Sequence, residues 1–507
     1  MSELDLTLVA RRPDATPVRA LELRHLIDGE WTSSSDATTF RRHSPSSGDL
    51  VSIASRGELP EVNAAISAAR RAFDKRAWSE TPGSERAALL NRVAGLIDAR
   101  REQIALYETL ESGKPISQAT AEIEGAANLW RYAATLAWNI RGDSQNALGA
   151  DMLGMVLKEP IGVVAMITPW NFPFLIISQK LPFALAAGCT AVIKPSEMTS
   201  ATTVILGEIL IEAGIPAGVV NIVLGFGDPV GSTLTTHPDV DMVSFTGSTG
   251  VGKAIVAATS RTLKKVSLEL GGKNPQVIFP DADLDEAADA IVFGVYFNAG
   301  ECCNSGSRII VHEDIVEALT DRVVVLSRRV PFGDPLDPAT KVGAIISTAH
   351  QEKIDGYVKA AAASGARVLL GGADIVIAGL PGHFYQPTVV TDVTAEMPIA
   401  TEEVFGPVLS VLKFRTFEEA IALANGAAYG LSAGVWSGSV HTCLRFAREV
   451  QAGTVWTNSW MDGYPELPFG GVKESGLGRE LGHNGIEEFL ETKTVQMRIG
   501  KTRAMWV

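Results

Sequence analysis

The chain has 507 residues, 46% of them hydrophobic and 20% charged, which is the composition of a folded globular protein with room for more than one core. Its 44 Lys and Arg against 58 Asp and Glu give a formal net charge of −14, which argues against nucleic acid or an anionic membrane surface as a partner. The longest apolar stretch, 175–193, is interrupted by Gln179, Lys180 and Pro182, so no membrane-spanning segment is expected.

The first 140 residues are expected to be mainly helical. Apolar residues at helical spacing between 62 and 73, and again between 90 and 97, predict two helices, and a third is expected from about 118 to 138. Gly142 and Asp143 then end the helical stretch.

From residue 160 the pattern changes to short apolar runs that are separated by helical stretches. The runs at 161–167, 190–193, 219–224 and 242–245 predict strands, and a helix is expected over 200–213, closed by Gly214. Such alternation indicates a parallel sheet covered on both faces, which is common to α/β proteins of many functions.

A second α/β unit follows. We expect a strand at 276–279, a helix at 282–297 capped by Asp281, and further strands and helices up to about residue 450. Polar and apolar residues alternate over 492–498, which predicts a strand with one exposed face or an edge that pairs with a partner chain.

Two adjacent cysteines lie in a polar, glycine-containing segment after the helix predicted at 282–297. Since buried structural cysteines usually have apolar neighbours, Cys302 and Cys303 are candidates for a nucleophile. A strained vicinal disulfide is an alternative, and a metal site is disfavoured because no His lies at ligand spacing. With Cys189 and Cys443 the chain has four cysteines, too few for a disulfide scaffold, so we expect a reducing, cytoplasmic location without a signal peptide.

Two polar residues follow predicted strands directly. Glu269 lies between two leucines before a glycine pair, where partial burial would suit it as a general base; the alternative is a solvent-facing residue at a strand end. Asn171 lies between aromatic residues and prolines, where its amide could donate to a developing oxyanion; the alternative is an Asx turn that caps the next helix.

Three further segments suggest a nucleotide site. Lys194 to Glu197 follow a predicted strand, at the edge of the sheet where ligands bind in doubly wound folds. Residues 245–252 combine a strand, a glycine turn and a helix start, which can cradle a phosphate. Neither this segment nor the glycine cluster at 225–231 has the G-x-G-x-x-G spacing.

Seven short motifs occur in a fixed order along the chain: Pro169-Trp170-Asn171, Lys194-Pro195-Ser196-Glu197, Phe245-Thr246-Gly247-Ser248-Thr249, Glu269-Leu270-Gly271-Gly272-Lys273, Gly300-Glu301-Cys302-Cys303, Glu403-Val404-Phe405-Gly406-Pro407 and Pro468-Phe469-Gly470-Gly471. In this order they resemble the aldehyde dehydrogenase superfamily over about residues 25–500.

The resemblance implies NAD-dependent oxidation of a small-molecule aldehyde to a carboxylic acid, without a metal. Cys303 would attack the aldehyde carbon, the amide of Asn171 and the backbone N–H of Cys303 would hold the oxyanion, and Glu269 would activate the water that hydrolyses the thioester. Lys194 and Glu197 would hold the adenosine ribose. The implied cofactor contacts are Ile167, Thr168, Pro169, Trp170, Lys194, Ser196, Glu197, Gly227, Phe245, Gly247, Ser248, Leu270, Glu403 and Phe405.

Two residues refine this expectation. Glu197 would accept hydrogen bonds from a ribose 2′-OH and repel a 2′-phosphate, so NAD is predicted over NADP. Glu301 stands where many members of the family carry Gln, and its charge is expected to raise the pKa of Cys303.

The resemblance also implies a substrate pocket, formed by Trp170, Phe174, Cys302, Trp460, Asp462 and Phe469. The aromatic rings and the Asp462 carboxylate would suit a cationic aldehyde, as in betaine- or amino-aldehyde oxidisers. The alternative is that Trp460 lines an aliphatic or aromatic tunnel and Asp462 faces solvent.

The implied fold is α/β: a Rossmann-type cofactor domain (1–138 and 161–270), an α/β catalytic domain (271–474) and a small β oligomerisation element (139–160 and 487–507) that would build a homodimer or homotetramer. Two other functions stay open at this point. A member that transfers the acyl group to coenzyme A is disfavoured because Glu269 is present. A non-catalytic, crystallin-like structural protein is disfavoured because Cys303, Glu269 and Asn171 are all present.

Overall fold

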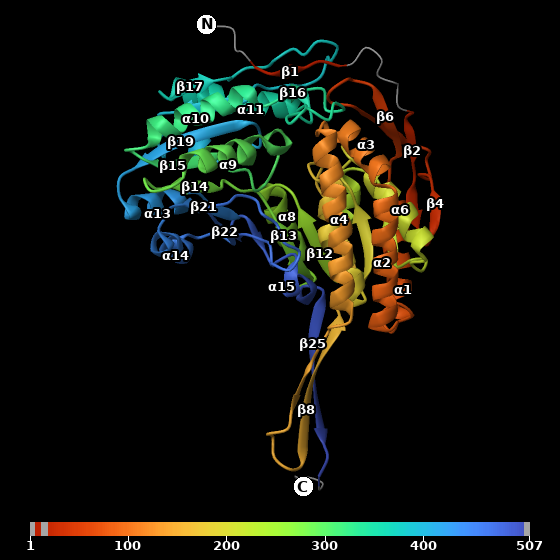
Figure 1. The fold of residues 1–507 in the computed structure, drawn as a ribbon. Coiled ribbons are helices and arrows are strands. Elements are labelled where there is room, and N and C mark those ends of the chain that lie inside the picture. The colour runs from red at the N-terminus through yellow and green to blue at the C-terminus, as the bar shows by residue number, and fades with distance from the viewer. Residues whose placement is uncertain (1–5, 12–18, 501–507) are drawn as a thin grey trace.

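The computed structural model describes residues 6–11 and 19–500. Two α/β units stand side by side, and a long arm of strands projects away from both (Figure 1). Within the described ranges no helix combines the length and the apolar character that crossing a bilayer requires.

The first unit is built on a sheet with the strand order β24-β13-β12-β9-β10-β11-β3-β4. Its inner strands, β9 to β13, pair in parallel, and β24, β3 and β4 extend the two sides with antiparallel pairs. The bounds are β3 (His25–Ile27), β4 (Glu30–Thr32), β9 (Val163–Ile167), β10 (Thr190–Lys194), β11 (Val220–Ile222), β12 (Met242–Thr246), β13 (Lys265–Glu269) and β24 (Gly476–Leu477).

Both faces of this sheet are buried, as the apolar runs predict. Along β9, Val163 and Ala165 belong to the core beneath helix α1, whereas Val164 and Met166 belong to the core formed with α2 to α6. The helices are α1 (Leu59–Asp74), α2 (Gly83–Ala99), α3 (Arg101–Ser112), α4 (Ile116–Ala137), α5 (Pro173–Ala187), α6 (Ala201–Ala213), η1 (Gly227–Gly231), α7 (Ser232–Thr236) and α8 (Thr249–Thr259).

The helices predicted in the first 140 residues are present as α1, α2 and α4, and helices make up most of the described part of that region. It also holds α3 and the strands β1 (Leu8–Val9), β2 (Leu21–Leu23), β3, β4, β5 (Thr39–His43) and β6 (Leu50–Ser55). These strands are two to six residues long, too short to give a clear alternation of polar and apolar residues.

The second unit contains the sheet β17-β18-β19-β15-β14-β21-β22, in which β17 alone of the described strands is antiparallel to its neighbour. Its strands are β14 (Pro275–Ile278), β15 (Arg308–His312), β17 (Arg367–Leu370), β18 (Thr388–Thr391), β19 (Val408–Phe414), β21 (Ser432–Trp436) and β22 (Thr454–Thr457). Its helices are α9 (Leu284–Tyr296), η2 (Phe297–Gly300), α10 (Val316–Arg329), α11 (Thr348–Ala363), α12 (Pro398–Thr401), α13 (Phe417–Asn425) and α14 (Val440–Glu449).

The cap predicted for α9 is wrong by two residues. Asp283, not Asp281, is the N-cap, and its carboxylate accepts hydrogen bonds from the backbone N–H groups of Asp285 and Glu286. Asp281 instead accepts a hydrogen bond from the Ser437 hydroxyl at 2.9 Å, which ties the start of the helix to the end of β21.

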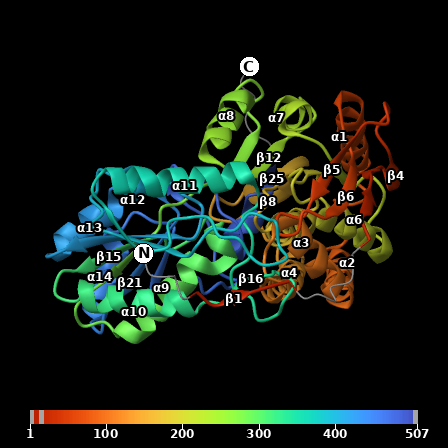
Figure 2. The ribbon, with the colours of Figure 1, turned by 90° about the horizontal axis from the view of Figure 1, so that it is seen from above.

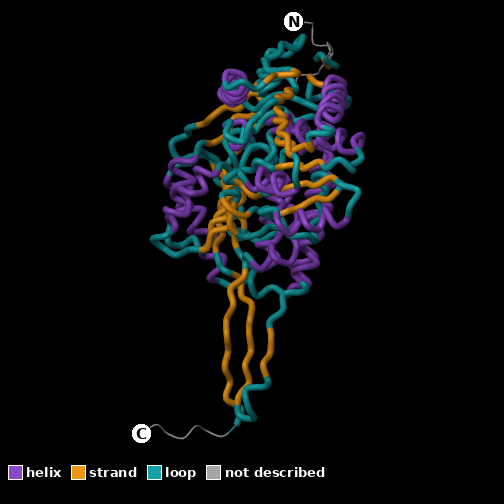
Figure 3. Tube along the Cα trace, turned by 90° about the vertical axis from the view of Figure 1, so that its left-hand side faces the viewer, coloured by secondary structure: helices purple, strands orange, loops and turns teal. Residues whose placement is uncertain are grey.

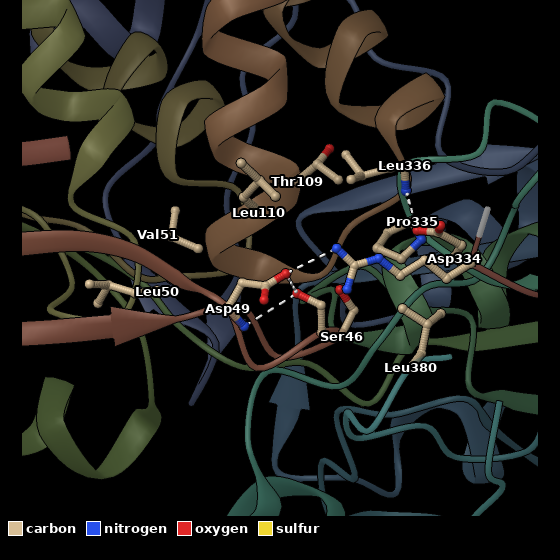
Figure 4. A pocket seen from close by; sticks show the side chains of 12 residues that line it. Ser46, Asp49, Leu50, Val51, Thr109, Leu110, Asp334, Pro335, Leu336 and Leu380 are labelled. Carbon is tan, nitrogen blue, oxygen red and sulfur yellow. Dashed lines mark hydrogen bonds and ion pairs between the residues drawn. The ribbon is translucent and has the colours of Figure 1, made fainter. Parts of the chain in front are cut away.

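The N-terminal segment contacts both units. Strand β1 pairs with β16 (Phe332–Gly333) of the second unit, and Arg11 forms an ion pair of 3.1 Å with Asp49 near the start of β6 (Figure 4). A cavity of about 30 Å³ lies at this junction, and it shares no lining residue with the pocket described below. Seen from above, the two units lie next to each other (Figure 2).

The arm is an antiparallel sheet in the order β25-β8-β7, with β7 (Asp143–Gln145), β8 (Met152–Pro160) and β25 (Leu490–Arg498). Helix α15 (Gly482–Glu487) precedes β25, and two short strands, β20 (Tyr429–Gly430) and β23 (Val472–Lys473), pair beside the sheets. The strand predicted at 492–498 is thus confirmed, and it extends from the body as part of the arm (Figure 3). Residues 1–5, 12–18 and 501–507 of the predicted domains lie outside the described residues.

The order of the parallel strands fixes where a ligand can bind. Strands β10 and β11 follow β9 on one side, whereas β12 and β13 lie on the other, so the chain reverses direction across the sheet between β9 and β12. In open parallel sheets the crevice for a ligand lies at such a switch point, at the carboxyl ends of the strands. Residues 168–171, 195–197, 247–248 and 270 directly follow the carboxyl ends of β9, β10, β12 and β13.

Candidate active site

Cys303 lies on a tightly wound loop after α9. Asn298, Ala299 and Gly300 all have positive φ, so the chain reverses there before the two cysteines. The loop is held from outside by Asn274, whose amide donates to the backbone oxygens of Cys303 (2.7 Å) and Ser305 (3.0 Å). A Cβ at Gly272 would stand 2.5 Å from the Cys303 oxygen, so the glycine pair before Lys273 lets this loop pack close to β13.

Both thiols of the cysteine pair are free, so the alternative of a vicinal disulfide does not hold in this structure. Cys302 is buried, whereas Cys303 is half-buried and faces the pocket. Contact with the Cys302 thiol, burial, and the carboxylates of Glu403 and Glu269 raise the pKa of Cys303 well above its usual range. The resting thiol is therefore protonated near neutral pH, and a base must accept its proton when it reacts.

The effect expected of Glu301 on the pKa of Cys303 is not among the largest effects in this structure. The carboxylates with the largest effect on the pKa of Cys303 are Glu403 and Glu269. The side chain of Glu301 is buried on another side of the loop, where its Oε1 accepts a hydrogen bond from the backbone N–H of Ile346 at 2.9 Å. Although Glu301 is two residues from Cys303 in the sequence, its carboxylate is directed toward Ile346.

A pocket of about 600 Å³ lies between the two units, and both Cys303 and Glu269 line it. Its wall is mostly aromatic and aliphatic, with a few carboxylates and amides. The other lining residues include Glu122, Phe172, Leu175, Ile176, Gln179, Thr246, Phe293, Phe297, Cys302, Asn304, Trp456, Met461, Asp462, Tyr464, Phe469 and Glu480. This composition is typical of a small-molecule site.

Glu269 ends β13 and is 4% exposed, so it is not the solvent-facing residue of the alternative interpretation. Neither carboxylate oxygen has a hydrogen-bond partner among the described residues. Burial raises the pKa of Glu269 well above its usual range, and the nearby carboxylate of Glu480 raises it further, whereas Lys180 and Arg479 oppose the rise. A carboxylate kept this basic can take a proton from water near neutral pH.

A buried ion pair lies beside Glu269. The Lys180 ammonium contacts the Glu480 carboxylate and donates a hydrogen bond to the Ser244 hydroxyl at 3.1 Å, and Glu480 lines the same pocket. Lys180 comes from α5 and Glu480 from the segment before α15, so the pair joins distant parts of the chain. The pair therefore holds one positive and one negative charge at fixed positions near Glu269.

Asn171 does not line the pocket, but its side chain reaches the loop of residues 298–305, which carries Cys303 and is called the cysteine loop. Its Nδ2 donates to the backbone oxygen of Glu301 at 3.0 Å, and the Asn298 amide donates to that same oxygen and to the backbone oxygen of Asn171. The amide of Asn171 is 4% exposed and does not cap α5. The Asx-turn alternative is therefore wrong.

The residues expected to hold the adenosine end of a cofactor gather at the carboxyl ends of β9, β10 and β12. Thr168 N donates to Lys194 O at 3.1 Å, and Lys194 Nζ stands 3.5 Å from the carboxylate of Glu197. Ser248 is the N-cap of α8, and its side chain makes no cap hydrogen bond. The hydroxyls of Thr168 and Thr246 are buried and, among the described residues, have no partner. Such a set of unpaired donors and acceptors suits a polar ligand.

A second group of cofactor candidates lies near the nucleophile. Glu403 accepts a hydrogen bond from Gly272 N at 2.9 Å, and Phe405, with φ 60°, packs edge-on against Trp170 with ring centroids 5.5 Å apart. The ring of His350 contacts both aromatic rings, and its Nε2 donates to Phe405 O at 2.7 Å. No sequence motif includes His350, which lies in α11, far along the chain from all of the motifs.

Three of the residues expected in the substrate pocket lie elsewhere. Trp170 packs on Phe405 and His350, Phe174 is fully buried in the core, and Trp460 packs behind Trp456 with ring centroids 4.9 Å apart. Cys302, Asp462 and Phe469 do line the pocket.

Phe172 and Trp456 provide aromatic wall in their place, and Glu122 contributes a carboxylate from α4. Glu122 carried a sequence signal, since it lies on the apolar face of a predicted helix, beside Ala119, Ile123 and Ala126. It contacts the buried Lys114, whose ammonium lies 4.2 Å from the ring centroid of Phe172.

Comparisons with known proteins agree with this geometry. The model of the aldehyde dehydrogenase family matches residues 31–495. Peroxisomal aminoaldehyde dehydrogenase 1 of Pisum sativum is 41% identical over 92% of this chain and 94% of its own length. The betaine aldehyde dehydrogenase of Bacillus subtilis is 40% identical over 95% of this chain and 98% of its own.

Solved structures are similar over nearly the whole chain. The crystal structure of an NAD-dependent aldehyde dehydrogenase from Sinorhizobium meliloti matches with a TM-score of 0.96 and 50% identity, over 99% of this chain and all of that one. Betaine aldehyde dehydrogenase from Staphylococcus aureus, in complex with NAD⁺, matches with a TM-score of 0.94 and 39% identity, over 96% of each chain.

Proposed function

The chain belongs to the aldehyde dehydrogenase family, and we propose that Cys303, Glu269 and Asn171 carry its NAD-dependent oxidation of an aldehyde to a carboxylic acid. The observation that carries this assignment is the presence of the Cys303 thiol and the buried Glu269 carboxylate in one pocket of about 600 Å³. A nucleophile and a base that face one cavity can act on the same bound carbonyl group.

The chemistry of the protein groups follows from their surroundings. The Cys303 thiol gives up its proton to a base and bonds to the aldehyde carbon. The Cys303 N–H and the second N–H of the Asn171 amide, whose first N–H donates to Glu301 O, would stabilise the oxyanion that forms. Loss of the aldehyde hydrogen with its electron pair leaves a thioester on Cys303. Glu269 then takes a proton from water as the water attacks this thioester, and the acid leaves with the Cys303 thiol restored.

The residues at the strand ends fit NAD, which accepts the hydride of the aldehyde when it is bound. The unpaired hydroxyls of Thr168 and Thr246 and the N-terminus of α8 provide polar contacts at the switch point of the sheet. The half-exposed Glu197, beside Lys194, would accept hydrogen bonds from ribose hydroxyls and repel a 2′-phosphate. Glu403 and Phe405 would lie at the nicotinamide end, next to Cys303.

We infer that the substrate is a cationic aldehyde of the betaine or aminoaldehyde type. Asp462 brings a carboxylate to the pocket, and Trp456 and Tyr464 contribute aromatic rings to its wall. Aromatic faces and carboxylates together attract ammonium groups. The similar proteins of Pisum sativum and Bacillus subtilis are named for aldehydes of this kind.

A panel of aldehydes tests both parts of the proposal. With NAD, we expect NADH formation from betaine aldehyde and 3-aminopropanal at higher kcat/KM than from propanal, and none from Cys303→Ala. Asp462→Asn should lower kcat/KM for the cationic aldehydes by about tenfold and leave propanal unchanged, whereas Glu466→Gln, on the same loop outside the pocket, should change neither. Equal losses for cationic and neutral aldehydes would refute the cationic substrate.

The arm supports a homo-oligomer. Leu148, Leu157, Met497 and Ile499 are 52%, 41%, 44% and 59% exposed on or beside its strands, and a groove of about 430 Å³ lies between β7, β8 and β25. Exposed apolar side chains on a projecting sheet are typical of an interface with another copy of the chain. We also propose a cytoplasmic location, supported by the four free thiols.

A further inference from the structure

Glu301 contacts two parts of the site, one through its backbone oxygen and one through its side chain. Its backbone oxygen accepts a hydrogen bond from the amide of Asn171 at 3.0 Å. Its buried side chain accepts a hydrogen bond from Ile346 N at 2.9 Å, four residues before His350. One residue thus fixes the position of the cysteine loop relative to Asn171 and relative to the start of α11.

The contacts continue from α11 to the loop that carries Phe405. His350 Nε2 stands 3.8 Å from the Glu301 carboxylate and donates to Phe405 O at 2.7 Å. The His350 ring also contacts the rings of Trp170 and Phe405. Gly300 allows the two loops to meet, because a Cβ there would lie 2.1 Å from the oxygen of Gly406.

Charged groups around Glu301 come from two other elements. Arg42 of β5 donates to Ile346 O at 3.3 Å and to Glu111 O, and Lys114 lies between α3 and α4. Both cations lower the pKa of Glu301, against the rise caused by burial. Glu111 faces the same arginine, and burial raises its pKa to about 7. The Arg42 guanidinium is already bound to backbone oxygens, so its position does not depend on a charge at Glu301.

We propose that Glu301 is a positioning residue whose side chain, through its hydrogen bond to Ile346 and through His350, holds Asn171 and Phe405 in register around Cys303. This role requires the side-chain oxygen of Glu301 at its position next to Ile346 N, and it does not require the negative charge of the carboxylate. This inference rests on the proposed function, since it takes Asn171 and Phe405 in the roles given above.

A matched pair of variants separates position from charge. Glu301→Gln keeps an oxygen at the same reach and removes the charge, whereas Glu301→Asp keeps the charge and withdraws the oxygen from Ile346 N by one methylene. We expect kcat and the Kd for NAD of E301Q within about threefold of wild type. We expect E301D to lose at least about tenfold in kcat and to bind NAD at least about threefold more weakly, because small displacements of reacting groups are costly in rate.

Two further measurements make the result specific. The rate of Cys303 alkylation by iodoacetamide without NAD should stay within about twofold in both variants, because Glu301 acts on the neighbours of the thiol. E301D with wild-type kcat and NAD affinity, E301Q impaired as much as E301D, or an alkylation rate changed more than about tenfold would each overturn the inference. Asn171→Ala separates this failure from failure of the proposed function, because wild-type kcat in N171A would remove the oxyanion role itself.

Discussion

Replacing Glu269 by Gln should stall the enzyme after a single turnover. The carboxylate is 4% exposed and lines the pocket with Cys303, and no other described residue hydrogen-bonds it. General bases contribute about 10²- to 10⁴-fold to a rate, which corresponds to about 3 to 5 kcal/mol of barrier. In E269Q we therefore expect steady-state kcat to fall at least about 100-fold, while a burst of one NADH per active site remains because the acyl group stays on Cys303.

The raised pKa of Glu269 determines the direction in which kcat and stability change with pH. Burial and Glu480 raise the pKa of Glu269, and a base works only when it is deprotonated, so wild-type kcat should fall as the pH falls through this raised pKa. The same rise favours the neutral carboxyl in the folded state, so its contribution to stability is present at low pH and is lost as the pH rises through the folded pKa. Gln never ionises, and E269Q should be at least as stable as wild type at alkaline pH.

Stopped-flow absorbance of NADH measures the burst and the steady state together, with Glu449→Gln, an exposed residue paired with Arg445, as the control. A steady-state kcat of E269Q within tenfold of wild type would refute Glu269 as the base. Loss of the burst as well would place its role before the thioester.

Glu197→Gln should raise the ratio of kcat/KM for NADP to that for NAD by about tenfold, because one charged contact to the ribose is lost and the repulsion of a 2′-phosphate is relieved. An unchanged ratio would contradict the role of Glu197 in selecting NAD. Phe174→Ala should lower the free energy of unfolding by about 3 to 5 kcal/mol in urea titrations, because the ring is fully buried, whereas Phe172→Ala should mainly raise KM for the aldehyde; the reverse pattern would place Phe174 in the pocket. Leu157→Glu on the arm should reduce the mass measured by light scattering to a smaller assembly, and an unchanged mass would exclude this face as an interface.

The sequence was most informative where one local pattern decides the structure. The apolar stripe at helical spacing between 62 and 73 predicts α1, which is buried on one face. The all-apolar runs predict β9, β10 and β12, which are buried on both faces. The motif residues Cys303 and Glu269 meet in one pocket although 34 positions separate them, since Glu269 ends β13 and Cys303 follows η2, and both line the space between the two units.

The sequence was less informative where side-chain direction or distant contacts decide. Phe172 and Phe174 follow Asn171 closely, yet one ring faces the pocket and the other the core, which depends on the first turn of α5. Glu301 lies two residues from Cys303, but the left-handed residues before it turn its side chain toward Ile346. His350 meets the site only through tertiary packing, so the pattern of neighbouring residues carries no signal of it.

The central claim is that the aldehyde becomes bonded to the sulfur of Cys303. Acid quenching of E269Q during turnover, followed by peptide mass spectrometry, measures this directly, because the variant should accumulate the thioester. We predict the added mass of the acyl group on Cys303 in the presence of NAD and aldehyde, and no such adduct when Cys303→Ala is combined with E269Q. An acyl group on Cys302, or an enzyme that turns over aldehyde with no acylated cysteine, would contradict the account.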